Sequence, residues 1–287
     1  MTFLISEISS NHNNDLKRCL ELIKISATIG CNAVKFQLFK IDELFAPEIL
    51  KKSSKHRERK KWELQVDYIP ELKSYCDNCG VEFGCTPFYL EAVEILTPYV
   101  SFFKIASYEL LWDDLLEACA KTGKPIILST GMATIDEIDH AVDVIKQSGC
   151  SDFTILHCVS SYPTHQNECN LSVIGNLRER YKVKIGWSDH SVDPQVIRRA
   201  VHRWKADCVE FHIDLDSKGV EYESGHCWLP EKISPLIEEL NAAKILDGNP
   251  KKLIAESEKL ERDWRADPSD GLRPLKHLRN TGPIENS

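Results

Sequence analysis

The chain has 287 residues, of which 42% are hydrophobic and 28% charged, and its formal net charge is −8. This composition is ordinary for a soluble globular protein, and the negative charge argues against nucleic acid as a general partner. No apolar run reaches the roughly 20 residues that span a membrane, and the first residues lack the basic stretch of a signal peptide.

Eleven cysteines are scattered along the chain. An odd number of cysteines at irregular spacing does not resemble a secreted disulfide framework. We therefore expect reduced thiols and a cytoplasmic protein without a membrane or nucleic-acid partner.

Eight short apolar runs lie between about residues 3 and 213, and most are followed by a helical pattern. The runs are LISEI from Leu4, AVKFQ from Ala33, VEFGC from Val81, FFKIA from Phe102, PIILS from Pro125, FTILH from Phe153, VKIGW from Val183 and CVEFH from Cys208. Nearly continuous apolar runs are typical of parallel strands covered by helices. Eight strand–helix units predict an α/β fold, the (β/α)₈ TIM barrel, with its active site at the carboxyl ends of the strands. We expect the barrel over residues 1–263 and an irregular C-terminal tail over 264–287.

Capping residues indicate where several helices begin. Asn14 is expected to cap the first helix, and Thr134 with Glu137 is expected to form a capping box. Asp193 followed by Pro194 predicts another helix start.

The longest connection covers roughly residues 38–62 and contains the basic run KKSSKHRERKK from Lys51 to Lys61. Long loops at the catalytic end of a barrel are often functional. The run is interpreted either as a solvated loop with a helix start or as a basic flap over an anionic substrate.

Two lysines and several serines lie at the strand ends. Lys35 and Lys104 interrupt otherwise apolar strands, where a buried ammonium group needs an anion or a carboxylate. Ser107, Ser129 and Ser160 offer neutral donors for phosphate oxygens, although each serine alone could equally form a turn or cap. The two lysines together favour anion binding.

His190 and His212 end the seventh and eighth strands. Neighbouring strands lie about 4.8 Å apart, so the two imidazoles can share one divalent ion. Glu7 ends the first strand, which a closed barrel places beside the eighth, and it could serve as a base or a ligand. The alternative for Glu7 is an ion pair with Lys35 on the second strand.

Seven segments carry a resemblance to a known family. They are SEISSNHNND, AVKFQLFK, EFGCTPF, FKIASYEL, KPIILSTGMAT, LHCVSSYPT and GWSDHS. In order and with similar spacing through residues 4–213, they resemble the sialic acid synthases, part of the wider group that makes nonulosonic acids such as legionaminic and pseudaminic acid. The family's catalytic domain is a (β/α)₈ barrel, in agreement with the strand count.

The resemblance implies a metal-dependent reaction that uses Mn²⁺ or Mg²⁺. Phosphoenolpyruvate condenses with the open-chain aldehyde of an N-acylated amino sugar, such as N-acetylmannosamine, and a 2-keto-3-deoxy sugar acid and phosphate are formed. The metal polarises the aldehyde oxygen, carbon 3 of phosphoenolpyruvate attacks the aldehyde, and water adds at carbon 2 before phosphate leaves.

The resemblance also implies roles for individual residues. The phosphoenolpyruvate contacts are expected at Lys35, Lys104, Ser107, Ser129, Ser188 and Ser160, the last being asparagine in some relatives. Residues lining the sugar site are expected at Gln37, Glu109 and Tyr162. His190 and His212 match the metal ligands, and Glu7 matches a glutamate proposed to handle the proton of the water. We predict Glu7, His212 and Lys104 as the catalytic residues.

The sequence departs from the family after the eighth strand, where relatives carry a GPD-like motif with an aspartate near the sugar. Here the sequence is DSKGVEYESGHCWLP. Glu221 fits by local motif, whereas Glu223 fits by its spacing to Pro230. For His226 and Cys227 a structural role is expected.

A second departure concerns the small antifreeze-like domain with which typical members continue and which lends an arginine to the partner subunit's sugar site. We expect the corresponding contact to the sugar to come from the long segment after the second strand, from the tail (Arg262, Arg265, Arg273) or from a separate protein. Otherwise the acceptor sugar differs from N-acetylmannosamine. A barrel-to-barrel homodimer is compatible with the sequence.

Two other functions compete with this reading. One is a condensing synthase of the 3-deoxy-octulosonate or heptulosonate type, which takes a phosphorylated sugar and needs a further basic clamp, with residues 51–61 as the obvious source. The other is a non-catalytic sugar-binding barrel. It is disfavoured because both lysines, both histidines and Glu7 are present.

Overall fold

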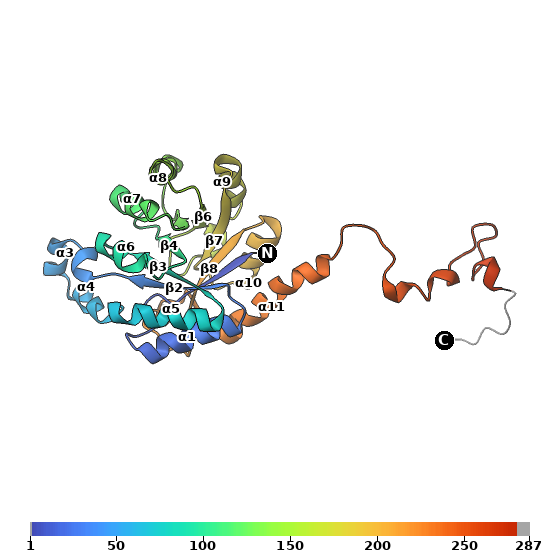
Figure 1. Ribbon diagram of the computed structural model, residues 1–287, viewed down its shortest axis with the longest axis horizontal. Helices are drawn as coiled ribbons and strands as arrows, with labels where there is room; N and C mark the ends of the chain where they lie inside the picture. Colours follow the sequence, from blue (N-terminus) through green and yellow to red (C-terminus); the bar gives the residue numbers. More distant parts are fainter. Residues whose placement is uncertain (1, 280–287) are drawn as a thin grey trace. The chain divides into compact units, whose positions relative to one another are not determined.

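Eight parallel strands form a closed ring in the computed structural model, which describes residues 2–279 apart from the side chain of Lys244 (Figure 1). The strands pair in chain order, and β1 also pairs with β8. Their bounds are β1 Phe3–Glu7, β2 Ala33–Leu38, β3 Glu82–Pro87, β4 Phe102–Ile105, β5 Ile126–Ser129, β6 Phe153–Cys158, β7 Lys184–Asp189 and β8 Cys208–Ile213. A two-residue strand, β9 (Cys227–Trp228), adds to β8. The predicted (β/α)₈ barrel is confirmed.

Helices lie outside the ring of strands (Figure 1). They are α1 Leu16–Thr28, α2 Ile41–Leu44, α3 Pro47–Lys52, α4 Ser54–Glu58, α5 Ile69–Cys79, α6 Leu90–Leu96, α7 Asp113–Lys121, α8 Ile135–Gln147, α9 Val173–Tyr181, α10 Pro194–Arg198 and α11 Pro230–Asp247. Among the described residues, no helix combines the length and the apolarity that a membrane crossing requires.

Most of the predicted helix caps are present. Thr134 and Glu137 form the capping box of α8, and Asp193 caps α10. The prediction of Asn14 as the cap of α1 is wrong, because the Asp15 carboxylate accepts the hydrogen bond from the Lys17 amide at 2.8 Å. Asn14 instead has a φ of 56° in the preceding turn.

The barrel interior changes from apolar to polar along the strands. A small inner cluster contains Ile5, Ala33, Phe102, Ile127, Leu156 and Cys208. Two residues further along five of these strands come Glu7, Lys35, Lys104, Ser129 and Glu210. Alternate residues of a strand point to the same side. The polar groups therefore form a second layer inside the barrel, nearer to the carboxyl ends of the strands than the apolar layer. The apolar layer thus closes the floor beneath the polar one.

Gly84 shows how tightly the floor is packed. A Cβ atom at this position would lie 2.3 Å from the ring of Phe102. The glycine on β3 therefore leaves room for a phenyl group on β4 inside the ring.

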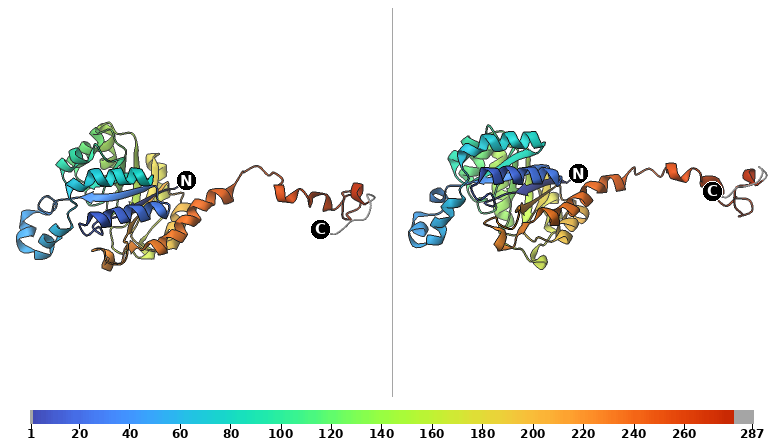
Figure 2. Two further views of the ribbon diagram at one scale, coloured as in Figure 1. Left: turned by 60° about the horizontal axis from the view of Figure 1, so that its bottom comes forward. Right: turned by 90° about the horizontal axis from the view of Figure 1, so that it is seen from below.

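The long segment after β2 contains α2, α3, α4 and two short 3₁₀ helices, Arg59–Trp62 and Val66–Tyr68. It projects from one side of the barrel in each view (Figure 2). The basic run at residues 51–61 is mostly helical, and its Lys60 forms an ion pair with Asp42 at 2.7 Å. The two interpretations of this run, a solvated loop with a helix start and a basic flap over an anionic substrate, both stay predictions.

The described chain divides into two compact units, one ending at Ala242 and the other beginning at Ala243. This limit falls inside α11, earlier than the predicted boundary at residue 263. The second unit contains three short 3₁₀ helices, Glu256–Glu258, Arg262–Trp264 and Lys276–Leu278. Residues 280–287 of the predicted tail lie outside the described residues.

Candidate active site

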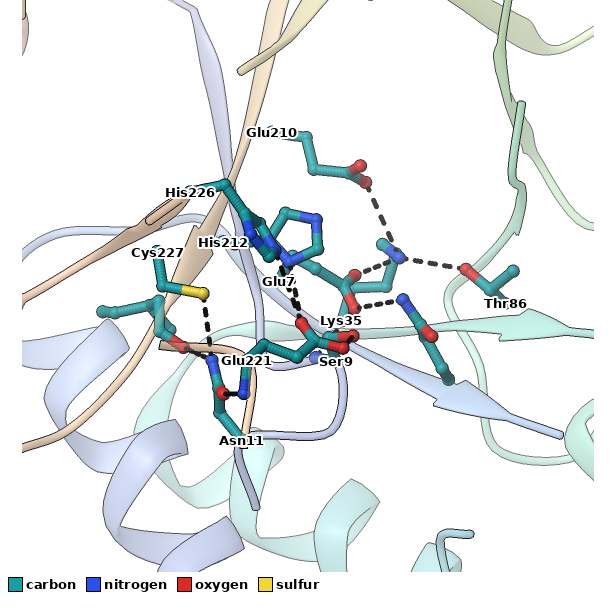
Figure 3. A network of polar contacts seen from close by, with 12 residues as sticks. Glu7, Ser9, Asn11, Lys35, Thr86, Glu210, His212, Glu221, His226 and Cys227 are labelled. Atoms are coloured by element: carbon teal, nitrogen blue, oxygen red, sulfur yellow. Dashed lines mark hydrogen bonds and ion pairs between the residues drawn. The ribbon is translucent and has the colours of Figure 1, made fainter. Parts of the chain in front are cut away.

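Strand register gathers the polar layer at the carboxyl ends of β1, β2, β7 and β8. Glu7 is paired in register with Lys35 on one side and with His212 on the other. Ser188 on β7 is paired with Glu210 on β8. Paired residues of parallel strands point to the same face, so these side chains meet inside the barrel. Figure 3 shows Glu7, Lys35, Glu210 and His212 of this group.

Glu7 and Lys35 form a buried ion pair within a hydrogen-bonded group. Oε1 of Glu7 accepts from the Ser9 amide at 2.8 Å and from Nε2 of Gln37 at 3.1 Å. Nζ of Lys35 donates to Oγ1 of Thr86 at 2.9 Å. Burial raises the pKa of Glu7, and the ammonium group of Lys35 opposes that rise. The ion pair expected as an alternative role for Glu7 therefore exists, and it holds the carboxylate at the mouth of the barrel.

Glu210 lies between the two lysines. Its Oε1 is 3.4 Å from Nζ of Lys104 and accepts from Oγ of Ser188 at 3.0 Å, and its Oε2 is 3.9 Å from Nζ of Lys35. Burial would raise the pKa of Glu210, but Lys104 and Lys35 together hold it at about 2. The carboxylate therefore stays ionised between the two lysine side chains inside the barrel.

Two of the predicted serines are in direct contact. Oγ of Ser107 and Oγ of Ser160 lie 2.8 Å apart. Gly131, with a φ of 41°, lies against this pair, and a Cβ there would be 2.3 Å from Ser160 Oγ and 2.5 Å from Ser107 Cβ. A glycine is needed for both the backbone conformation and the close approach. Ser129, at the end of β5, is buried beside the thiol of Cys158.

Three buried imidazoles and one tyrosine form the other side of the mouth. The ring centroid of His212 is 5.4 Å from that of His190 and 4.6 Å from that of His226. The ring of Tyr162 lies 4.3 Å from His190. Nδ1 of His190 donates to the carbonyl oxygen of Val159 at 2.8 Å, which leaves a lone pair on Nε2. Burial, followed by the neighbouring His212, lowers the pKa of His190 to about 3, so the ring is neutral.

Glu221 points into this imidazole cluster. Its Oε1 accepts from Oγ of Ser9 at 2.6 Å, and its amide donates to Oδ1 of Asn11 at 2.9 Å. Its Oε2 lies 3.4 Å from Nδ1 of His212 and 3.6 Å from Nε2 of His226. Burial would raise the pKa of Glu221, but the two imidazoles hold it well below its usual range.

The donor set beside Glu221 fits a divalent cation. One ligand atom from each of four residues lies within 4.8 Å of the others, namely His212, Glu221, His226 and Cys227. Nδ1 of His212 and Oε2 of Glu221 are buried without a hydrogen-bond partner. Buried polar atoms of this kind are rare without a missing ligand, and imidazole and carboxylate groups are both common metal ligands.

The remaining predicted residues have different surroundings. Burial raises the pKa of Glu109, in the loop after β4, to about 7, and nearby Lys104 opposes this rise. Glu223 is exposed in the 3₁₀ helix Tyr222–Ser224, so of the two alternatives only Glu221 points at the imidazoles. The roles inferred for these residues stay predictions.

Several polar residues of the site were given no role in it from the sequence, although His226 and Cys227 were named with a structural role expected. Glu210 is a lone acid two residues before His212 in an apolar strand, and this spacing places the two on one face. Thr86 similarly ends β3. His226 and Cys227 had no such signal, because a two-residue strand brings them to the site.

Comparisons with known proteins identify the family of this chain. The model of the NeuB family matches residues 22–252. An uncharacterized protein of Methanocaldococcus jannaschii is 37% identical over 261 residues, which are 90% of this chain and 75% of that protein. The N,N'-diacetyllegionaminic acid synthase of Campylobacter jejuni is 36% identical over 75% of this chain and 68% of its own length.

Among solved structures, the N-acetylneuraminic acid (sialic acid) synthetase of Leptospira borgpetersenii has a TM-score of 0.79 and 31% identity. The match covers 94% of this chain and 93% of that one. A truncated 3-deoxy-D-arabino-heptulosonate 7-phosphate synthase of Thermotoga maritima, with a TM-score of 0.66 and 14% identity, shares the fold. With the family match extending over most of the barrel, this chain belongs to the NeuB family.

Proposed function

We propose that this protein condenses phosphoenolpyruvate with the open-chain aldehyde of an N-acylated amino sugar. The products would be a 2-keto-3-deoxy nonulosonic acid and phosphate. Membership of the NeuB family and the similarity to legionaminic and sialic acid synthases support this proposal. One observation carries it: two buried ammonium groups face the same barrel mouth as a cluster of imidazoles and a carboxylate.

The ammonium groups of Lys35 and Lys104 bind the anionic substrate in this proposal. Phosphoenolpyruvate carries a carboxylate and a phosphate, and each group needs a compensating cation in a site without bulk water. Glu210 lies within 4 Å of Nζ of both lysines. The Ser107–Ser160 hydroxyl pair adds neutral donors for phosphate oxygens, and Ser129 and Ser188 are predicted to do the same.

Glu7 is proposed to take the proton of the water that adds at carbon 2. Its carboxylate is fixed by the Ser9 amide and by Gln37, and burial makes it more basic than a free glutamate. A general base needs both a defined position and a raised pKa. When the C2–O bond breaks, phosphate leaves with the bonding electron pair and can accept the proton from Glu7, while Lys35, which contacts Glu7 directly, stabilises the negative charge of the phosphate.

Histidines on β8 and after β7 are proposed to hold the divalent ion, Mn²⁺ or Mg²⁺. When bound by His190 and His212, such an ion would supply Lewis acidity toward the aldehyde oxygen of the sugar. The neutral His190 ring offers its Nε2 lone pair because Nδ1 is held by Val159.

The sugar is proposed to lie against Tyr162, Gln37 and Glu109. Tyr162 is 38% exposed and packs its ring on His190, so it offers an apolar face and a hydroxyl beside the imidazoles. Glu221 is proposed as the acidic residue near the sugar in preference to Glu223, since Glu223 is exposed to solvent.

A panel of aldoses tests the proposal. Phosphate release from phosphoenolpyruvate is measured with N-acylated and non-acylated aldoses, each in phosphorylated and unphosphorylated form. The mass of the keto acid formed is determined by mass spectrometry. We expect release with an unphosphorylated N-acylated hexosamine and a nine-carbon product. Release only with a phosphorylated four- or five-carbon aldose would identify the alternative synthase class, and binding of sugar without release would identify a non-catalytic barrel.

Location and assembly remain part of the proposal. All eleven cysteines are free thiols and ten of them are buried, which supports a reducing, cytoplasmic compartment. The barrel-to-barrel homodimer stays a prediction.

A further inference from the structure

We propose that His212, Glu221, His226 and Cys227 form one four-ligand site for a zinc-class transition-metal ion. Three of these residues follow β8 or lie on β9, and the fourth lies on β8. The inference concerns metal binding alone, so it does not depend on the condensation reaction proposed above.

The separations between the ligand atoms match those around a small ion. Two ligands that are each about 2.1 Å from a tetrahedral zinc ion lie about 3.4 Å apart. Oε2 of Glu221 is 3.4 Å from Nδ1 of His212 and 3.6 Å from Nε2 of His226. These distances are long for hydrogen bonds between the same groups. The carboxylate and the two rings therefore surround a space of the size that an ion occupies.

Two of the polar atoms that face this space lack a hydrogen-bond partner. Oε2 of Glu221 and Nδ1 of His212 are both buried and make no hydrogen bond within the described residues. His226 and Cys227 are 4% and 5% exposed. Burying Oε2 and Nδ1 without a partner is unfavourable, and a cation would satisfy both at once.

A second set of contacts fixes the ligands, as is usual around metal ions. Oγ of Ser9 donates to the other oxygen of Glu221, which directs Oε2 toward the rings. Nδ2 of Asn11 lies 3.3 Å from Sγ of Cys227, and Oδ1 of Asn11 accepts from the Glu221 amide (Figure 3). One side chain, that of Asn11, thus positions both the sulfur of Cys227 and the backbone of Glu221.

The chemistry of the ligands selects the ion. A thiolate with two imidazoles suits Zn²⁺, Co²⁺ or Fe²⁺, whereas Mg²⁺ prefers oxygen ligands in octahedral geometry. His190 is outside this set, since its ring centroid is 6.4 Å from that of His226 and its Nδ1 is held by Val159. The four-ligand site and the predicted His190–His212 pair thus share only His212.

Cobalt titration of the chelator-treated protein tests the inference. We expect one Co²⁺ per chain, with a thiolate-to-cobalt charge-transfer band and intense four-coordinate ligand-field bands, and displacement by Zn²⁺ but not by Mg²⁺. C227S should lose the charge-transfer band, and H226A should bind Co²⁺ at least about tenfold more weakly. C169S, which removes another buried thiol, and H165A, which removes an exposed imidazole, should behave like the unaltered protein.

The variant H190A separates the two sites. The inference is wrong if H190A abolishes cobalt binding while H226A and C227S bind cobalt as tightly as the unaltered protein. It is also wrong if the unaltered protein shows no thiolate-to-cobalt charge-transfer band. Circular dichroism of each metal-free variant checks folding, and H226Q and C227A replace any variant that unfolds. A protein that binds cobalt through the thiolate but releases no phosphate would refute the proposed function and leave this inference intact.

Discussion

The two sides of the barrel mouth satisfy their polar groups in different ways. The lysine side comprises Glu7, Lys35, Lys104, Ser188 and Glu210, and the imidazole side comprises His190, His212, Glu221, His226 and Cys227. On the lysine side each ammonium group has a carboxylate within 4 Å. On the imidazole side Nδ1 of His212 and Oε2 of Glu221 face each other at 3.4 Å without a hydrogen bond. The charges of the lysine side are paired within the protein, whereas we propose that a cation completes the imidazole side.

This difference indicates how each side should respond to mutation. Removing a charge from a balanced buried network leaves the opposite charge unpaired, which destabilises the fold itself. Removing a ligand from an incomplete cluster costs binding and turnover more than folding. The following variants test this contrast.

The largest effect is expected for K104M. The change leaves Glu210 with only the more distant Lys35, and breaking a buried ion pair costs about 3–5 kcal/mol. We expect the free energy of unfolding in denaturant to fall by about that amount and phosphate release to be lost. K121M, which breaks an exposed pair with Glu117 on α7, should cost less than about 1 kcal/mol.

The double variant K104M/E210Q sharpens this test. It removes both charges, so it should recover part of the stability while remaining inactive. A double variant as unstable as K104M alone would show that the loss is due to packing and not to the unpaired carboxylate.

A moderate effect is expected for E221Q, with E223Q as its matched control. Glu221 contacts both imidazoles, whereas Glu223 is exposed two residues away. We expect turnover to fall by roughly 10–100-fold in E221Q, with a smaller change in unfolding free energy than in K104M. Equal turnover of the two variants would show that Glu221 is not the functional carboxylate.

A smaller effect is expected for G131A, which places a methyl group against the Ser107–Ser160 pair. Overpacking costs about 1–3 kcal/mol, and displacement of the hydroxyls should raise the KM for phosphoenolpyruvate. G123A is the control, because Gly123 also has a positive φ but has no atom within 4 Å of its added Cβ. A KM that is unchanged in G131A would exclude this hydroxyl pair from substrate binding.

The effect expected for E109Q appears only as a pH dependence of the free energy of unfolding. Burial raises the pKa of Glu109 from 4.5 to about 7, so the folded protein retains a proton that the unfolded chain loses in this range. The contribution of Glu109 to the free energy of unfolding is therefore full below pH 4.5 and falls as the pH rises toward 7. The free energy of unfolding in denaturant should differ less between pH 5 and pH 8 for E109Q than for the exposed-site control E94Q. An identical difference would mean that Glu109 is solvated.

Most of the fold could be predicted from the sequence, because each strand is a compact apolar run and each run repeats the same strand–helix unit. The cap of α1 was placed wrongly because Asn14 and Asp15 both suit the position, and only the backbone turn decides between them. Lys35 and Lys104 could be recognised because charge inside an apolar strand is conspicuous.

The partners of these residues were harder to predict. Glu210 on β8 lies near Lys35 on β2 and Lys104 on β4 only because the strands close into a ring, and sequence periodicity does not specify which side chains then meet inside it. His226 and Cys227 reach the site through β9, a strand too short to leave a periodic signal.

The pairing of the first strand with the eighth has a consequence for biosynthesis. Ser9 and Asn11, made at the start of translation, hold Glu221 and Cys227, made more than 200 residues later. A nascent chain that has left the ribosome only as far as its sixth strand has Glu7 beside Lys35 but lacks Glu210, the carboxylate that lies next to Lys104. Such an intermediate carries Lys104 without its carboxylate partner until the eighth strand joins the first and closes the ring.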